Sequence, residues 1–92
     1  MGTVVIKLGS SIVCDDAGQP RHEVLDHVCD EVAALHADGR DVVIVTSGAI
    51  ARGMGVMGLG ARPRAIDELQ AASAVGQGQL YRDYDELLSA RR

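Results

Sequence analysis

The sequence predicts an α/β fold that starts with a parallel strand–helix–strand (βαβ) unit. Two short runs rich in β-branched residues, Thr3–Leu8 and Asp41–Thr46, show no alternation of polar and apolar residues. That pattern is typical of strands covered on both faces of a parallel sheet. A segment of helical periodicity separates them, and strands joined through a helix run parallel with a right-handed crossover.

The helix between the strands is indicated by apolar residues from Val24 to Leu35 that recur every three or four positions. Pro20 suits the approach to its first turn, and Gly39 suits a left-handed cap after its last turn. Acidic residues occupy the opposite positions and predict a solvent-exposed face. The first strand is predicted to end in a turn at Gly9 and the two serines that follow.

After the second strand, Gly48–Arg52 is predicted to open another helix, and Gly53–Pro63 is predicted to be a glycine-rich loop. The last segment, Ala65–Ala90, again has helical periodicity. Its apolar residues form two stripes, and we expect Gly76 and Gly78 between them to bend or split the helix.

Composition limits what this chain can be. It has 92 residues, a formal charge of −4, two tyrosines and neither Trp nor Phe, which indicates one small domain with a thin core. Two parallel strands leave apolar edges unpaired, so we expect further strands from residues beyond Arg92 or from another chain. An acidic chain is a poor non-specific nucleic-acid binder, and no apolar run reaches the ~20 residues that span a bilayer. Cys14 and Cys29 lack the spacing of a disulfide framework or zinc site, which fits a reducing cytoplasm.

The candidate chemistry lies where the two strands end, because ligands of open parallel sheets bind outside the carboxyl ends of the strands. Lys7 is a charged residue in an otherwise apolar strand and is costly to bury unless its ammonium group meets an anion. With Gly9 and Ser10 beside it, this turn suits phosphate oxygens. The alternative is a lysine that reaches water beside an ordinary turn.

The second strand ends at Ser47 and Gly48, immediately before a predicted helix. Backbone amides at the start of a helix favour a carboxylate or a phosphate. The alternative is that Ser47 merely caps the helix while Gly48 makes a tight turn.

Other patterns in the sequence are weaker evidence for a functional site. Gly53–Gly58 matches GxGxxG, but the motif must directly follow a strand to bind a dinucleotide, so we predict a connector there. The three histidines lie in or beside the first helix, away from both turns. The acidic cluster at Asp83, Asp85 and Glu86 is predicted to be solvated. Tyr81 and Tyr84 are predicted to pack in the core or at a subunit contact.

Three segments together carry a resemblance: VVIKLGSS at Val4–Ser11, VVIVTSGAIARG at Val42–Gly53, and AASAVGQGQL at Ala71–Leu80. In this order and spacing they resemble the glutamate 5-kinases of the amino acid kinase family, or the kinase half of the bifunctional pyrroline-carboxylate synthases. The resemblance extends from Val4 to Leu88.

The resemblance implies an ATP-dependent phosphotransferase that moves the γ-phosphate of ATP to the γ-carboxylate of L-glutamate, the first step of proline biosynthesis. By it, Lys7 would be catalytic and contact the ATP phosphates, with Gly9 and Ser10 in the same ATP-binding loop. The resemblance also implies that glutamate would be bound by Ser47, Gly48 and Ala49. Mg²⁺ would be held with the nucleotide, and no protein ligand is assigned to it.

In that family the kinase domain is a several-fold longer three-layer αβα sandwich with a mainly parallel sheet. We therefore expect residues 1–92 to be its N-terminal part, inactive alone and lacking the nucleotide pocket. A cytoplasmic homo-oligomer with small-molecule substrates, and with neither nucleic-acid nor membrane partners, is expected. The alternatives are a non-catalytic anion-binding or subunit-contact module, or a family member acting on a different carboxylate.

Overall fold

The computed structural model describes residues 2–91, which form two strands and four helices. In chain order, the elements are β1 (Thr3–Leu8), α1 (Ser10–Val13), α2 (His22–Ala37), β2 (Asp41–Thr46), α3 (Ala49–Met57) and α4 (Ile66–Ser89). The predicted α/β order is confirmed.

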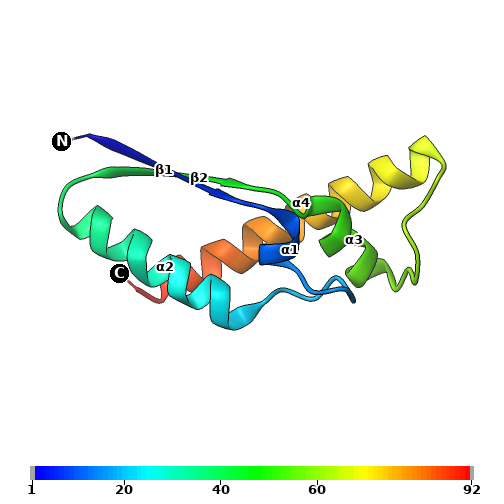
Figure 1. Cartoon of the computed structure of the whole chain (residues 1–92), viewed down its shortest axis with the longest axis horizontal. Helices are drawn as coiled ribbons and strands as arrows, with labels where there is room; N and C mark the ends of the chain where they lie inside the picture. The colour runs from blue at the N-terminus through cyan, green and yellow to red at the C-terminus, as the bar shows by residue number, and fades with distance from the viewer. Residues whose placement is uncertain (1, 92) are drawn as a thin grey trace.

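The two strands pair in parallel, with Thr3 opposite Asp41 and Leu8 opposite Thr46. Both α2 and the second half of α4 lie on one side of these strands (Figure 1). Leu8 points to that side and is only 7% exposed, whereas Val5, on the other face of β1, is 63% exposed. Within residues 2–91 the helices therefore cover one face of the sheet only.

Helix α2 follows the predicted pattern. Leu25 and Cys29 are fully buried, while the acidic positions on the opposite face are exposed. The helix ends as predicted at Gly39, whose φ of 83° is left-handed and whose N–H donates to the carbonyl of His36 at 3.0 Å. Because glycine has no Cβ, it adopts this conformation without steric cost.

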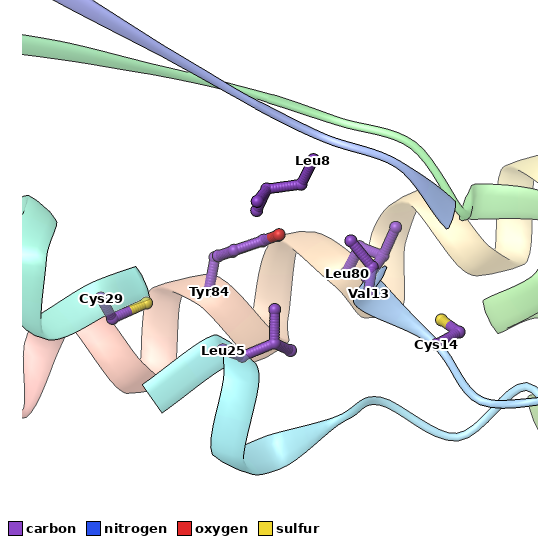
Figure 2. Packing of buried hydrophobic residues seen from close by; sticks show 7 residues of the cluster. All are labelled: Leu8, Val13, Cys14, Leu25, Cys29, Leu80 and Tyr84. Atoms are coloured by element: carbon purple, nitrogen blue, oxygen red, sulfur yellow. The ribbon is translucent and has the colours of Figure 1, made fainter. Parts of the chain in front are cut away.

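The core lies between the covered face of the sheet and helices α1, α2 and α4 (Figure 2). Its buried members are Leu8, Val13, Cys14, Leu25, Cys29, Leu80 and Tyr84. The molecule is elongated, 44 Å by 22 Å by 18 Å, with a radius of gyration of 14.2 Å. A compact domain of this length would have about 12 Å. The molecule is thus more elongated than a compact domain of this length.

Helix α1 was not predicted, because its two serines read as part of a turn. Val13 explains why the chain coils here: its side chain is completely buried, and a single helical turn from Ser10 delivers it to the core. The turn closes with the N–H of Cys14 donating to the carbonyl of Ser10 at 2.9 Å.

Helix α3 corrects the prediction of a glycine-rich loop from Gly53, because it continues to Met57. Gly53 faces α4, where a Cβ atom would overlap the carbonyl oxygen of Ala72. The glycine therefore permits a close approach of two helices instead of interrupting one. Gly58, with φ of 72°, is the residue that ends the helix.

Helix α4 corrects a second prediction, because it runs unbroken for 24 residues. Gly76 does not bend it. A Cβ at Gly76 would overlap the carbonyl oxygen of Ala49 and lie 2.7 Å from the amide nitrogen of Gly53. In the second apolar stripe, Leu80 and Tyr84 are buried and Leu87 and Leu88 are half-buried. The first stripe is buried only at Ala72, and its Ile66 is 74% exposed.

Gly76→Ala should lower the free energy of unfolding by about 2 kcal/mol or more, because the added methyl group forces α3 away from α4. Gly78→Ala is the matched control: nothing lies within 4 Å of its Cβ position, so it should stabilise the helix by roughly 0.5–1 kcal/mol. Urea unfolding followed by circular dichroism measures both. Equal effects of the two substitutions would contradict this packing.

Stability should also fall as the pH rises above about 9. Burial raises the pKa of the Cys14 and Cys29 thiols above their ordinary value of 9.0, and it raises the pKa of Tyr84 above 10.0. At alkaline pH the unfolded chain therefore releases protons that the folded chain retains, which favours unfolding. Urea titrations between about pH 7 and pH 10 test this. The Cys14→Ala/Cys29→Ala variant should lose less stability over this range, and an unchanged slope would refute the assignment to the thiols.

Candidate functional site

The loops that follow β1 and β2 meet at the carboxyl edge of the sheet. The N–H of Ser47 donates to the carbonyl of Leu8 at 2.9 Å, which joins the end of one strand to the end of the other. Gly48 has a φ of 99°, and a Cβ there would lie 3.5 Å from Cα of Ser10. The parallel pairing thus brings the two predicted loops into contact.

A hollow of about 310 Å³ opens at this edge. Its lining residues are Ser10, Thr46, Ser47, Gly48, Ala49, Ile50, Ala51, Arg62 and Ser73. Four of the predicted site residues are therefore gathered around one space. Arg62 and Ser73 were missed, because nothing in the sequence distinguishes Arg62 from the nearby Arg64, and Ser73 reads as an ordinary helical residue.

The first turn of α3 forms one wall of the hollow. Gly48 is its N-cap residue and no side chain caps the helix, so the alternative that Ser47 serves as the cap is wrong. The first backbone amides of a helix have no partner within it, and they carry partial positive charge. Arg62 adds a full positive charge to the lining, which contains no carboxylate among the described residues. The hollow therefore favours an anion.

Thr46 fixes the end of β2 through two hydrogen bonds. Its hydroxyl donates to the carbonyl of Ser47 at 3.2 Å, and its Oγ1 lies 3.0 Å from Oη of Tyr84. Because the single Thr46 proton is used in the first bond, Tyr84 is the donor in the second. Burial raises the pKa of Tyr84 above its ordinary value of 10.0.

Lys7 and Gly9 are the predicted residues that do not line the hollow. Lys7 is exposed on the uncovered face of β1, opposite Val45. Its ammonium group is therefore not buried and does not require an anion to offset the cost of burial. Gly9 has an ordinary extended φ of −74° and open space at its Cβ position. Lys7 is not among the residues that line the hollow, and its role stays a prediction.

Arg52 and Asp83 attach the first turns of α3 to α4. Nε of Arg52 lies 3.0 Å from Oδ2 of Asp83, and both side chains are largely buried, at 11% and 14% exposure. Gln79 also donates to Asp83, at 3.1 Å. The prediction that Asp83 is solvated is therefore wrong, because a buried arginine on another helix requires its charge.

Asp83→Ala should lower the free energy of unfolding by about 3 kcal/mol, because it leaves Arg52 buried without a counter-charge. Asp85→Ala is the matched control: this exposed carboxylate two residues further along α4 should contribute less than about 0.5 kcal/mol. Chemical unfolding of the two variants gives the comparison. If both lose little stability, the ion pair does not hold α3 in place.

No group of three or more His, Cys, Asp or Glu residues within residues 2–91 is arranged to hold a metal ion. Cys14 and Cys29 are both free thiols. None of the helices in this described range combines the length and apolar character needed to cross a bilayer.

The fold and the paired strand-end loops define a parallel α/β protein with a hollow at the carboxyl edge of its sheet. Residues 2–92 match the Amino acid kinase family, so nearly the whole sequence is covered. The chain belongs to the amino acid kinase family.

Individual curated relatives allow a comparison with particular members of the family. The chain is 43% identical over 83 residues to glutamate 5-kinase of Pelobacter propionicus. It is 49% identical over 82 residues to the glutamate 5-kinases of Burkholderia cenocepacia and Burkholderia multivorans. These alignments cover about 90% of this chain but only 22% of each relative, so the chain spans about a fifth of their length.

Proposed function

We propose that this chain is the N-terminal part of a glutamate 5-kinase, which transfers the γ-phosphate of ATP to the γ-carboxylate of L-glutamate. The observation that carries the proposal is the contact between the two strand-end loops, around a hollow that favours an anion. Family membership and the identity to glutamate 5-kinases support the same reaction.

In this proposal glutamate binds in the hollow, against Ser47, Gly48 and Ala49. Its γ-carboxylate is ionised at pH 7, so the nucleophile needs no general base. The protein has to position the two reactants and neutralise charge during phosphoryl transfer. The helix amides, Ser10 and Lys7 are the groups of this chain that suit those tasks.

The ATP phosphates are proposed to extend over Gly9 and Ser10 toward Lys7, at the same edge of the sheet. Residues 2–91 provide no cluster of carboxylates for Mg²⁺. Mg²⁺, which would neutralise phosphate charge, is proposed to be held with the nucleotide, and no protein ligand is assigned to it. The remaining pocket would come from sequence that follows this segment, in a cytoplasmic homo-oligomer.

One observation favours a more limited role for residues 1–92 taken alone. Val5, Val43 and Val45 lie on the uncovered face of the sheet and are 63%, 47% and 46% exposed. Because exposed apolar strands require a covering partner, the isolated segment is proposed to lack activity and to act only within the complete domain.

The full-length protein should form ADP only when both ATP and L-glutamate are present. Hydroxylamine should trap the acyl phosphate product as glutamyl hydroxamate, which a colorimetric assay detects. L-aspartate, one methylene group shorter, is the control acceptor and should react poorly. Glutamate-independent ADP release, or no hydroxamate, would contradict the proposed reaction.

Lys7→Ala should lower kcat by about 10²–10³-fold, because it removes a positive charge expected at the transferred phosphate. Val5→Thr changes a neighbouring exposed residue on the same face of β1 and should leave kcat near the wild-type value. Circular dichroism verifies that both variants are folded. Near-normal turnover of folded Lys7→Ala would exclude Lys7 from the reaction.

A further inference from the structure

The hollow has a second wall, which lies outside the two strand-end loops. Arg62, in the connection between α3 and α4, and Ser73, on α4, line it together with the strand-end loops. Figure 1 shows this connection next to α3, at the end of the molecule away from the N-terminus. We propose that Arg62 binds the α-carboxylate of glutamate and thereby determines which acceptor is used; this inference rests on the proposed function.

Charge is the first argument for this assignment. The chain carries a formal charge of −4, yet the hollow is lined by an arginine and by no acidic residue of the described range. Glutamate has two carboxylates, and the amides at the start of α3 provide only partial charges for one of them. A guanidinium group supplies a planar pair of donors that matches the second carboxylate.

The availability of Arg62 is the second argument. Arg52 is paired with Asp83, and Arg91 is paired with Asp26 and Asp30. Arg62 forms no ion pair with any carboxylate in the part of the chain that the structure describes. Its charge is therefore free to bind a ligand in the hollow.

The position of Arg62 selects the α-carboxylate. The γ-carboxylate must approach the phosphate donor, which is proposed to lie over Gly9 and Ser10 at the strand ends. The other end of the substrate then extends toward the α4 side of the hollow, where Arg62 and Ser73 lie. An arginine on the reacting carboxylate would instead tie up the oxygens that attack phosphorus.

Steady-state kinetics of the full-length protein test the assignment. Arg62→Ala should raise KM for glutamate by about 10-fold or more, with a smaller change in KM for ATP. Arg62→Lys should recover part of the loss. Arg64→Ala is the matched control, because Arg64 is also exposed in this connection but does not line the hollow.

A substrate analogue separates this role from a structural one. The α-carboxamide of glutamate keeps the reacting γ-carboxylate but removes the charge that Arg62 would bind. Wild type should discriminate against the analogue by about 10-fold or more in kcat/KM, and Arg62→Ala should lose most of that discrimination.

Each outcome is decisive. Equal kinetics for Arg62→Ala and Arg64→Ala, or wild type that does not discriminate against the carboxamide, would overturn the inference while the kinase activity stands. Retained discrimination in Arg62→Ala would overturn it as well. A wild-type protein without glutamate-dependent turnover would instead refute the proposed function, and the role of Arg62 with it.

Discussion

The parallel register of β1 and β2 is the constraint on which the site depends. Because Leu8 pairs with Thr46, both strands end at the same level, and both loops leave from one edge of the sheet. The hydrogen bond from Ser47 to Leu8 then fixes the second loop against the first. A shift of one residue would turn every side chain of one strand to the opposite face, exposing Leu8 and separating the loops.

Helix α4 holds α3 and the end of β2 in place around the hollow. Its Gly76 lets α3 approach closely, its Asp83 pairs with Arg52 of α3, and its Tyr84 binds the end of β2 through Thr46. These three contacts orient the first turn of α3, whose amides form one wall of the site. The residues that stabilise the helix crossing therefore also hold the first turn of α3 in position beside the hollow.

The strands and α2 could be predicted from the sequence, because β-branched runs and apolar periodicity depend on local chemistry. The meeting of Ser10 with the Ser47–Ala49 segment could be predicted as well, because it follows from the parallel pairing of the strands. It misjudged Gly53 and Gly76, since glycine either interrupts a helix or allows another helix to approach, and only the tertiary contact decides which. Asp83 was misjudged for the same reason: its partner lies 31 residues away on another helix. The position of Arg62 at the hollow could not be predicted from neighbouring residues, because it depends on the path of the connection between α3 and α4.

We propose that the hollow at the carboxyl edge holds the phosphate acceptor, between the first turn of α3 on one side and Arg62 on the other. A crystal structure of the full-length protein with L-glutamate and a non-hydrolysable ATP analogue tests it most directly. We expect glutamate in this hollow, with its γ-carboxylate toward Ser10 and its α-carboxylate on Arg62. Glutamate bound elsewhere, or nucleotide phosphates in the hollow, would contradict it.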